Sequence, residues 1–368
     1  MLQASLEGVD PYQSVLARLP ADLDVETLAR ETKALTRRRG LQSGTALLRL
    51  AIAWSCGGQS MQEVAAWATE QGVAELTEEA LLQRLHGAGA FLQAVSESLL
   101  PGIGARPSWQ GRVFRIADST SLSERASKGT DWRVHAVYDL GRGGFSHLEV
   151  TDQHGAEALD RGKPVAGEVR VGDRGFANAP AWQRYLQACP EDVDFIVRMR
   201  WNTIRLCDAS GTCFDLIGWL RSRSAAAEID EVIAWAQAGR GHKPTEIRLI
   251  ARRKSPEDIE KAHKALRQRA SRKQTNLDPR SLIAAEYLVL ATSLSAEAFP
   301  AAEVLSAYRL RWQIELAFKR LKSLMQIDKI PTRTEAGTRC WLYGHLIVAL
   351  LCEDFSQDLL DSFPSGPC

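Results

Sequence analysis

The chain has 368 residues, of which 45% are hydrophobic and 25% are charged, and its formal net charge at pH 7 is +1. This is the composition of a globular protein with two or three domains, and the net charge alone does not indicate a nucleic-acid partner. No apolar run reaches membrane-spanning length and no signal-peptide pattern opens the chain, so we expect a cytoplasmic protein without a membrane partner. The seven cysteines contain no CxxC pair, which argues against a zinc site.

The first hundred residues repeat apolar side chains at helical spacing and contain almost no strand pattern. Ser60 is followed at the third position by Glu63, which predicts a capping box at the start of one helix. We therefore expect an all-helical N-terminal domain over residues 1–105, ending in the Pro- and Gly-rich linker Pro101–Pro107. A helix–turn–helix DNA-binding unit and a plain helical bundle both remain open. The predicted helices are Thr45–Ala53, Met61–Thr69, Glu78–Leu85 and Phe91–Leu100.

Residues 106–200 change to strand patterns, with a Gly-rich turn between the second and third strands. Three antiparallel strands, a parallel strand, a helix and a further strand indicate a mixed sheet of α+β or α/β type. The predicted helix is Ala179–Cys189. The predicted strands are Val113–Ala117, Arg133–Asp139, His147–Thr151, Val169–Val171 and Asp194–Arg200.

Residues 201–295 are predicted to be a β-rich insertion, and residues 296–368 to complete the core with two helices, Tyr308–Lys322 and the apolar Cys340–Leu351. Basic residues gather locally at Arg37–Arg39 and over residues 252–273, which suits basic grooves on a nearly neutral protein. The insertion is expected to contain a basic helix, Asp258–Arg272. Its predicted strands are Thr203–Cys207, Cys213–Leu220, Ile229–Ala236, Glu246–Ala251 and Glu286–Thr292.

The segment Tyr308–Lys322 contains no Pro or Gly and is predicted to be one helix with two unlike faces. One stripe carries a single carboxylate among bases and aromatic rings, where the acid can bind a divalent cation and the bases can hold phosphates. An ordinary solvated face with i,i+4 ion pairs is the alternative. The polar stripe consists of Tyr308, Arg311, Glu315, Lys319 and Lys322, with Trp312 beside it. The apolar face consists of Leu310, Ile314, Ala317, Leu321 and Leu324.

Two aspartates follow short predicted strands. Asp118 lies just past the first strand, and Asp173 lies at the end of a later one. Acids at the ends of neighbouring strands can converge, and with Glu315 they would supply the three carboxylates that two divalent cations about 3.5–4 Å apart require. Each aspartate by itself also fits a turn or a helix cap.

These residues resemble a known family. Asp118 in ADST, Asp173 in GDRGF, and the pattern Tyr308-x2-Arg311-x3-Glu315-x6-Lys322 are similar to the DDE transposases of bacterial insertion sequences that carry the YREK signature, the insertion sequence 4 group. The resemblance covers about residues 25–350. It implies an α/β fold with an RNase H-like mixed-sheet catalytic core, interrupted by the β-rich insertion and preceded by the helical domain.

The resemblance also implies a function. Asp118, Asp173 and Glu315 would bind Mg²⁺, for which Mn²⁺ can substitute, and catalyse DNA cleavage and strand transfer. The partners would be double-stranded DNA, as transposon-end inverted repeats and as target, and a second copy of the chain in a synaptic complex at the bacterial nucleoid. The DNA-binding residues would be Tyr308, Arg311, Trp312, Lys319, Lys322, Arg174, Arg198 and Arg200.

Two alternatives come from other classes. A two-carboxylate hydrolase such as a glycosidase would also place paired acids in a cleft, although the bases around Glu315 argue against it, and EDTA would leave its activity intact. A catalytically impaired, truncated transposase remnant would bind DNA as a repressor without cutting it.

Overall fold

The computed structural model describes residues 10–362, except for 101–106, 126, 128, 190–191, 224–227 and 240. Most of the predicted linker lies outside these residues. The N-terminal helices are confirmed, and both hydrogen bonds of the capping box are present, from Glu63 N to Ser60 Oγ (3.2 Å) and from Ser60 N to Glu63 Oε2 (2.7 Å). The helices are α1 (Pro11–Leu16), α2 (Val25–Glu31), α3 (Gly44–Cys56), α4 (Met61–Glu70), α5 (Glu78–His86) and α6 (Gly89–Leu99).

All nine named strands belong to one mixed sheet, in the order β3-β2-β1-β4-β5-β9-β8-β7-β6. Strands β1 to β3 form an antiparallel meander, β4 and β5 run parallel to β1, and β9 returns antiparallel to β5. The predicted mixed sheet is therefore confirmed. The strands are β1 (Val113–Leu122), β2 (Trp132–Asp139), β3 (Gly144–Asp152), β4 (Glu168–Gly172), β5 (Asp194–Arg198), β6 (Leu206–Cys207), β7 (Ile229–Ala236), β8 (Thr245–Arg253) and β9 (Tyr287–Thr292).

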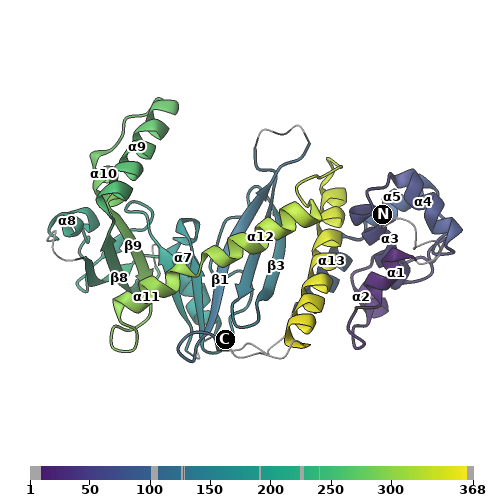
Figure 1. The fold of residues 1–368 in the computed structure, drawn as a ribbon, viewed down its shortest axis with the longest axis horizontal. Coiled ribbons are helices and arrows are strands. Elements are labelled where there is room, and N and C mark those ends of the chain that lie inside the picture. Colours follow the sequence, from purple (N-terminus) through teal and green to yellow (C-terminus); the bar gives the residue numbers. More distant parts are fainter. Residues whose placement is uncertain are drawn as a thin grey trace.

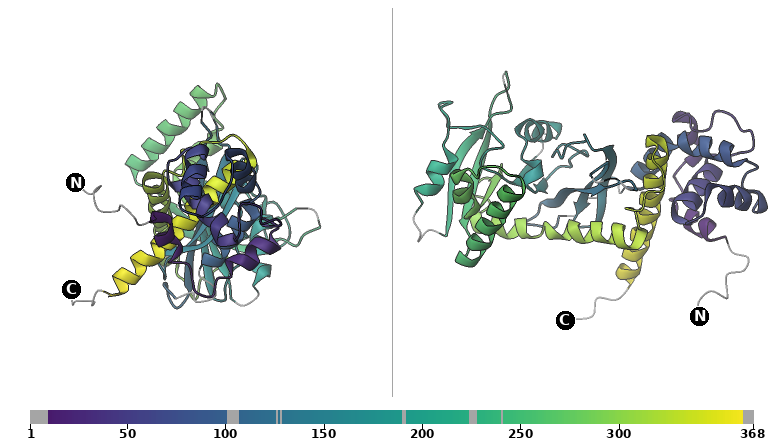
Figure 2. Two further views of the ribbon diagram at one scale, coloured as in Figure 1. Left: turned by 90° about the vertical axis from the view of Figure 1, so that its right-hand side faces the viewer. Right: turned by 90° about the horizontal axis from the view of Figure 1, so that it is seen from above.

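Helices cover both faces of the sheet, and each face has its own hydrophobic core (Figures 1 and 2). On one face, α7 (Ala179–Ala188) buries Trp182 and Tyr185 beside Phe195 of β5. On the other face, α11 (Ala301–Arg309) and α12 (Trp312–Met325) run nearly in line across the strands. Their buried side chains join Ile116, Val171 and Ile196 in the second core.

The last helix, α13 (Glu335–Ser362), stands between the edge of the sheet and the N-terminal helices (Figure 1). Buried residues of α13 share a core with α3 and α6 on one side and with β3 on the other. The hydroxyl of Tyr343 accepts a 3.3 Å hydrogen bond from the backbone of Val150 in β3. In the part of the chain that the structure describes, no helix is long and apolar enough to cross a membrane.

The region predicted to be a β-rich insertion departs from prediction in one of its predicted strands. Strands β6 to β9 extend the same sheet, but Cys213–Leu220, predicted as a strand, contains the helix α8 (Leu216–Arg221). Its buried residues Leu216, Ile217 and Leu220 follow helical spacing, which a short apolar run does not distinguish from a strand. The basic helix α9 (Pro256–Arg272) is confirmed, contains no buried residue, and projects with α10 (Pro279–Ala285) from the sheet (Figure 1).

The predicted single helix Tyr308–Lys322 is two helices joined at Leu310 and Arg311. Three backbone N–H groups at this junction donate to the carbonyl oxygen three residues earlier, as in a 3₁₀ helix, so the helix is more tightly wound there. Ile314, Ala317 and Leu321 are buried as expected, and Leu310 is half-buried. Tyr308, predicted on the polar stripe, is only 8% exposed, because it faces the sheet rather than solvent.

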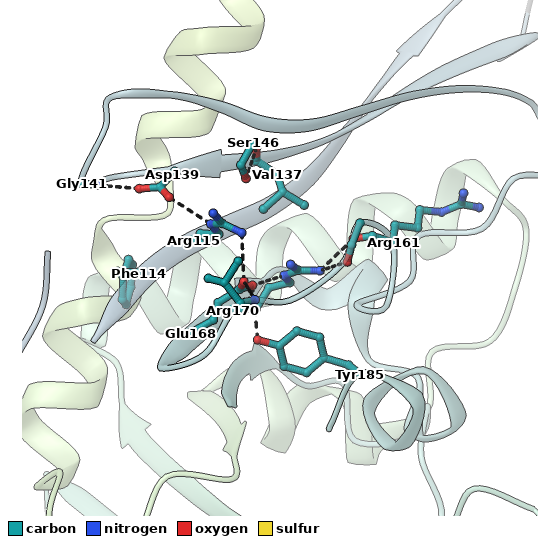
Figure 3. Close-up of polar contacts among 12 residues, drawn as sticks. Phe114, Arg115, Val137, Asp139, Gly141, Ser146, Arg161, Glu168, Arg170 and Tyr185 are labelled. Atoms are coloured by element: carbon teal, nitrogen blue, oxygen red, sulfur yellow. Dashed lines mark hydrogen bonds and ion pairs between the residues drawn. The ribbon is translucent and has the colours of Figure 1, made fainter. Parts of the chain in front are cut away.

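A buried ionic cluster ties β1, β2, β4 and α7 together (Figure 3). Arg115 bonds Asp139 (3.0 Å) and Glu168 (3.1 Å). Glu168 also accepts from Arg170 (2.6 Å) and Tyr185 (3.3 Å). Each buried charge thereby has an opposite partner, which is the condition under which such groups are tolerated in a core.

Candidate active site

Asp118 lies within β1, and Asp173 lies directly after the neighbouring parallel strand β4. The last paired residues of β1 and β4 are Ala117 and Gly172, so each aspartate is the next residue along its chain. Asp173 follows its strand as predicted. Asp118 does not end its strand, because β1 continues to Leu122 through pairing with β2, in which Asp118 faces Ala136.

The Asp118 carboxyl lies in a strongly desolvated position. Burial raises its pKa to about 6, the carboxylates of Glu157 and Asp173 act in the same direction, and a backbone hydrogen bond from Ser119 (2.8 Å) and the charge of Arg311 oppose them. An acid held among other acids in this way favours any added positive charge nearby.

Asp173 is held ionised by its neighbours. Burial alone would raise its pKa, but a backbone hydrogen bond from Arg174 and the charges of Arg198 and Arg311 outweigh burial and lower it. Arg198 Nη1 lies 3.9 Å from Asp173 Oδ1. The hydroxyl of Tyr308 donates a 3.1 Å hydrogen bond to the same oxygen. Burial and the Asp173 charge raise the pKa of Tyr308, so its proton is retained for this bond.

Arg311 connects Asp118 with Glu315. Its Nη1 lies 3.6 Å from Asp118 Oδ2, and its Nη2 bonds Glu315 Oε1, one turn along α12. The Glu315 side chain is 54% exposed, whereas the side chains of Arg311 and Asp118 are mostly buried. Asp118 and Glu315 therefore share the guanidinium of Arg311 as a contact, and Asp173 lies near enough to Asp118 and Arg311 for their charges to act on one another.

Within the described ranges, no group of three or more His, Cys, Asp and Glu side chains is arranged to hold a metal ion. The chemistry of the donors nevertheless fits a hard divalent cation, because Asp118, Asp173 and Glu315 offer only carboxylate oxygens. Burial, with smaller contributions from the charges of Glu157 and Asp173, raises the pKa of Asp118 to about 6, and a bound cation would favour its ionised form. The donor atoms of these residues therefore suit the kind of cation that the sequence predicts.

Two lysines of α12 lie beside the acids. Lys319 and Lys322 line an open hollow of about 570 Å³ together with Asp118 and Glu315. Lys322 Nζ donates a 3.2 Å hydrogen bond to the carbonyl oxygen of Ser121 in β1. Trp312, at the start of α12, is 50% exposed. These three residues are placed as the predicted polar stripe requires.

The predicted arginines gather at a second hollow, which shares no lining residue with the first. Arg174, Arg198 and Arg200 line this hollow of about 440 Å³, together with Lys254, which directly follows β8, and Arg269 of α9. Burial and the neighbouring Arg198 lower the pKa of Arg174, which is the sign of crowded positive charge. This hollow is a place where an anion would be favourable.

One acidic residue of the site has no signal in the sequence. Glu157, in the loop after β3, accepts a 2.6 Å hydrogen bond from Ser119 Oγ and lies near enough to Asp118 to affect its pKa. It belongs to no recognisable motif and lies in an irregular segment 38 residues after Ser119. Only the folded chain brings it to the site.

Several known proteins are similar to this chain in sequence. Residues 109–351 match a family model described as the transposase DDE domain. InsL for insertion sequence element IS186A of Escherichia coli (strain K12) is 35% identical over 358 residues, covering 96% of each chain. The transposase for IS421 of Escherichia coli is 35% identical over 359 residues, again 96% of each. The transposase for IS231F of Bacillus thuringiensis subsp. israelensis is 27% identical over 238 residues, 60% of this chain and 49% of that one.

Among solved structures, a chain of the piggyBac transposase synaptic complex with hairpin DNA covers 98% of this chain and 78% of its own, with a TM-score of 0.47 and 9% identity. That likeness is too weak to carry an argument. The family match spans well over half of the chain, and the two Escherichia coli relatives span nearly all of it. The chain therefore belongs to the transposase DDE domain family and is an enzyme of the DDE transposase class, which cuts DNA and joins it by strand transfer.

Proposed function

We propose that this transposase binds the terminal inverted repeats of its own insertion sequence, cuts the DNA at those ends and joins them to a target. The observation that carries the proposal is the adjacency of Asp118 and Asp173 at the split between β1 and β4, with Arg311 linking Asp118 to Glu315. The match of Tyr308, Arg311, Glu315 and Lys322 in spacing supports membership of the YREK group.

Asp118, Asp173 and Glu315 would hold the divalent cation, Mg²⁺ or Mn²⁺. When bound, it supplies Lewis-acid chemistry: it activates the attacking oxygen and stabilises the leaving oxygen of phosphoryl transfer. The chain's own task is to keep these carboxylates ionised and aligned. At Asp173, Tyr308 orients the carboxylate by donating a hydrogen bond from its hydroxyl, and at Asp118 the charge of Arg311 opposes the effect of burial.

Positive side chains on both sides of the acids would hold the DNA backbone. Lys319 and Lys322 line one hollow, and Arg174, Arg198 and Arg200 line the other. Contacts of this kind go to phosphates and therefore fix the position of the duplex without reading its sequence. The scissile phosphate would lie between the two hollows, next to Asp118 and Asp173.

Sequence recognition would belong to the helical domain of residues 1–105. Strands β1 to β5 with residues 296–368 would form the RNase H-like core, and residues 201–295 the insertion that contributes α9. A second copy of the chain would complete a synaptic complex, in which two ends are held together. The exposed basic run Arg37–Arg39 on the helical domain supports a DNA contact there.

The test is cleavage of a labelled duplex that carries the ends of the insertion sequence, compared with a duplex of random sequence. We expect cuts at the element's ends in Mg²⁺ or Mn²⁺ and none in EDTA. Binding of the ends without any cleavage in either metal would instead identify a DNA-binding remnant. Hydrolysis of a glycoside that EDTA does not inhibit would identify the alternative hydrolase.

A further inference from the structure

The carboxylate of Glu157 lies in the split between the two segments that carry the aspartates. Pairing between β1 and β4 stops at Ala117 and Gly172, and beyond that point the two chains diverge. Side chains alternate along a strand, so Ser119 faces away from the side on which Asp118 meets Arg311. Glu157 approaches from this rear side and contacts both diverging chains.

Two contacts define its position. Ser119 Oγ donates a 2.6 Å hydrogen bond to Glu157 Oε1. Glu157 Oε2 lies against Gly175, in the place that a side chain at position 175 would fill, since a Cβ there would overlap this oxygen. One carboxylate thus touches the residue after Asp118 and the glycine two residues after Asp173. Arg133 Nη1, 3.8 Å from Oε1, is its positive neighbour.

The loop that carries Glu157 is firmly anchored. Arg170, which is 1% exposed, donates from Nη1 to the carbonyl oxygens of Leu159 (2.9 Å), Arg161 (2.7 Å) and Gly162 (3.0 Å). Arg161 in turn donates to the carbonyl oxygen of Ala156 (2.9 Å). Figure 3 shows the side chain of Arg170 extending from the buried ionic cluster toward Arg161. Glu157 is therefore held by the same cluster that joins β1 to β4.

A further acid near enough to Asp118 to act on its charge is electrostatically unfavourable, yet Glu157 is fixed there by Ser119 and Arg133. We propose that Glu157 is a positioning residue for DNA cleavage: through Ser119 on one side and Gly175 on the other, it sets the separation of Asp118 and Asp173. This inference rests on the proposed function. Misplacement of a reacting group by about 1 Å can slow a reaction about 10²-fold, so loss of Glu157 should slow cleavage by about that factor.

The experiment measures single-turnover cleavage of end DNA by the full chain, with DNA affinity and Tm determined for every variant. Glu157→Ala and Ser119→Ala remove the same hydrogen bond from its two ends, and Glu157→Gln keeps an acceptor for Ser119. Gly175→Ala displaces the carboxylate by filling its place. Asp160→Asn, in the same loop but paired with Arg184, is the matched control.

We expect Glu157→Ala, Ser119→Ala and Gly175→Ala each to slow cleavage about 10²-fold, with DNA affinity and Tm unchanged. Glu157→Gln should remain within about threefold of the parent, because the hydrogen bond survives. Combining Glu157→Ala with either other substitution should add no further loss, because all three disrupt one contact. Asp160→Asn should cleave like the parent.

Parental cleavage by Glu157→Ala would overturn the inference, as would equal losses in the alanine and glutamine variants. So would additive losses in the combined variants, or rates that simply follow a lowered Tm. Asp118→Asn, measured in the same series, distinguishes failure of the role of Glu157 from failure of the proposed function. If it is inactive while Glu157→Ala is active, only the role of Glu157 fails; if Asp118→Asn itself cleaves like the parent, the proposed function fails with it.

Discussion

The hydroxyl of Tyr308 donates a 3.1 Å hydrogen bond to Asp173 Oδ1, joining α11 to the end of β4. The sequence predicts Tyr308 on a polar stripe and does not predict this contact with Asp173. The phenol is buried and its hydroxyl donates to a carboxylate, so its first effect is on the orientation of Asp173.

Tyr308→Phe removes this hydrogen bond and leaves the ring in its core position. A hydrogen bond to a charged group contributes about 1.5–3 kcal/mol, so we expect end cleavage to slow tenfold or more. DNA affinity and its salt dependence should not change. A smaller salt slope at an unchanged cleavage rate would mean that Tyr308 contacts a phosphate, as the sequence predicted, rather than supporting Asp173.

Lys322→Ala tests the basic hollow beside Asp118. The lost phosphate contact should weaken binding and reduce the slope of log K against log salt by about one. Lys329→Ala, an exposed lysine that bonds Gln326 after the end of α12, is the control and should leave the slope unchanged. Equal slopes for the parent and both variants would make Lys322 part of an ordinary solvated surface.

Trp312 and Leu316 are exposed apolar residues one turn apart on α12, at 50% and 41%. A ring beside a scissile phosphate can stack on a base taken out of the duplex, at about 1–3 kcal/mol per base. Trp312→Ala should therefore permit nicking of the first strand and impair the later hairpin or second-strand step. Leu316→Ala should leave both steps intact.

The position of Trp312 speaks against a role in the core, because half of its surface is exposed. Gel analysis of the nicked and fully cut products over time separates the two steps. A uniform loss of both products, or a loss of folded protein in Trp312→Ala, would show that the ring supports the fold instead.

His345 predicts a pH dependence of stability. It is buried in α13, bonds the carbonyl oxygen of Trp341 (2.9 Å), and burial lowers its pKa to about 4. Above pH 6.5 the imidazole is neutral in both states. Between about pH 6.5 and 4 only the unfolded chain takes up the proton. The free energy of unfolding therefore decreases as the pH is lowered, by about 3 kcal/mol in total.

His345→Phe keeps a ring in the same position and removes the titration. The drop in Tm between pH 7.5 and 5 should be smaller in this variant than in the parent. His135, whose pKa burial also lowers to about 4, retains a dependence of the same sign. An identical drop in the variant and the parent would exclude His345 as its source.

Much of the fold was predictable because local patterns determine it. Strand alternation located β1 to β5, and Ser60 with Glu63 marked the start of α4. Cys213–Leu220 could not be assigned in this way, since a short apolar run fits a strand or a helix until its neighbours are known. The junction at Arg311 is likewise a tertiary effect, because no Pro or Gly marks it.

The candidate residues of the site could be predicted from motif spacing, but the contacts between their side chains could not. The order of Asp118, Asp173 and Glu315 is readable from the sequence. The burial of Tyr308 against Asp173 and the arrival of Glu157 behind Ser119 depend on how α11 and the loop after β3 are placed on the sheet. No local pattern contains that information.

The central claim is that Asp118, Asp173 and Glu315 act as one catalytic centre, and the most direct measurement is the single-turnover rate of first-strand nicking in preformed complexes. Asp118→Asn, Asp173→Asn and Glu315→Gln keep side-chain size and remove one charge each. Because metal-assisted phosphoryl transfer needs all three carboxylates, each variant should bind end DNA like the parent and show no detectable nicking in Mg²⁺. Near-parental nicking by any one of them would contradict the account at that residue.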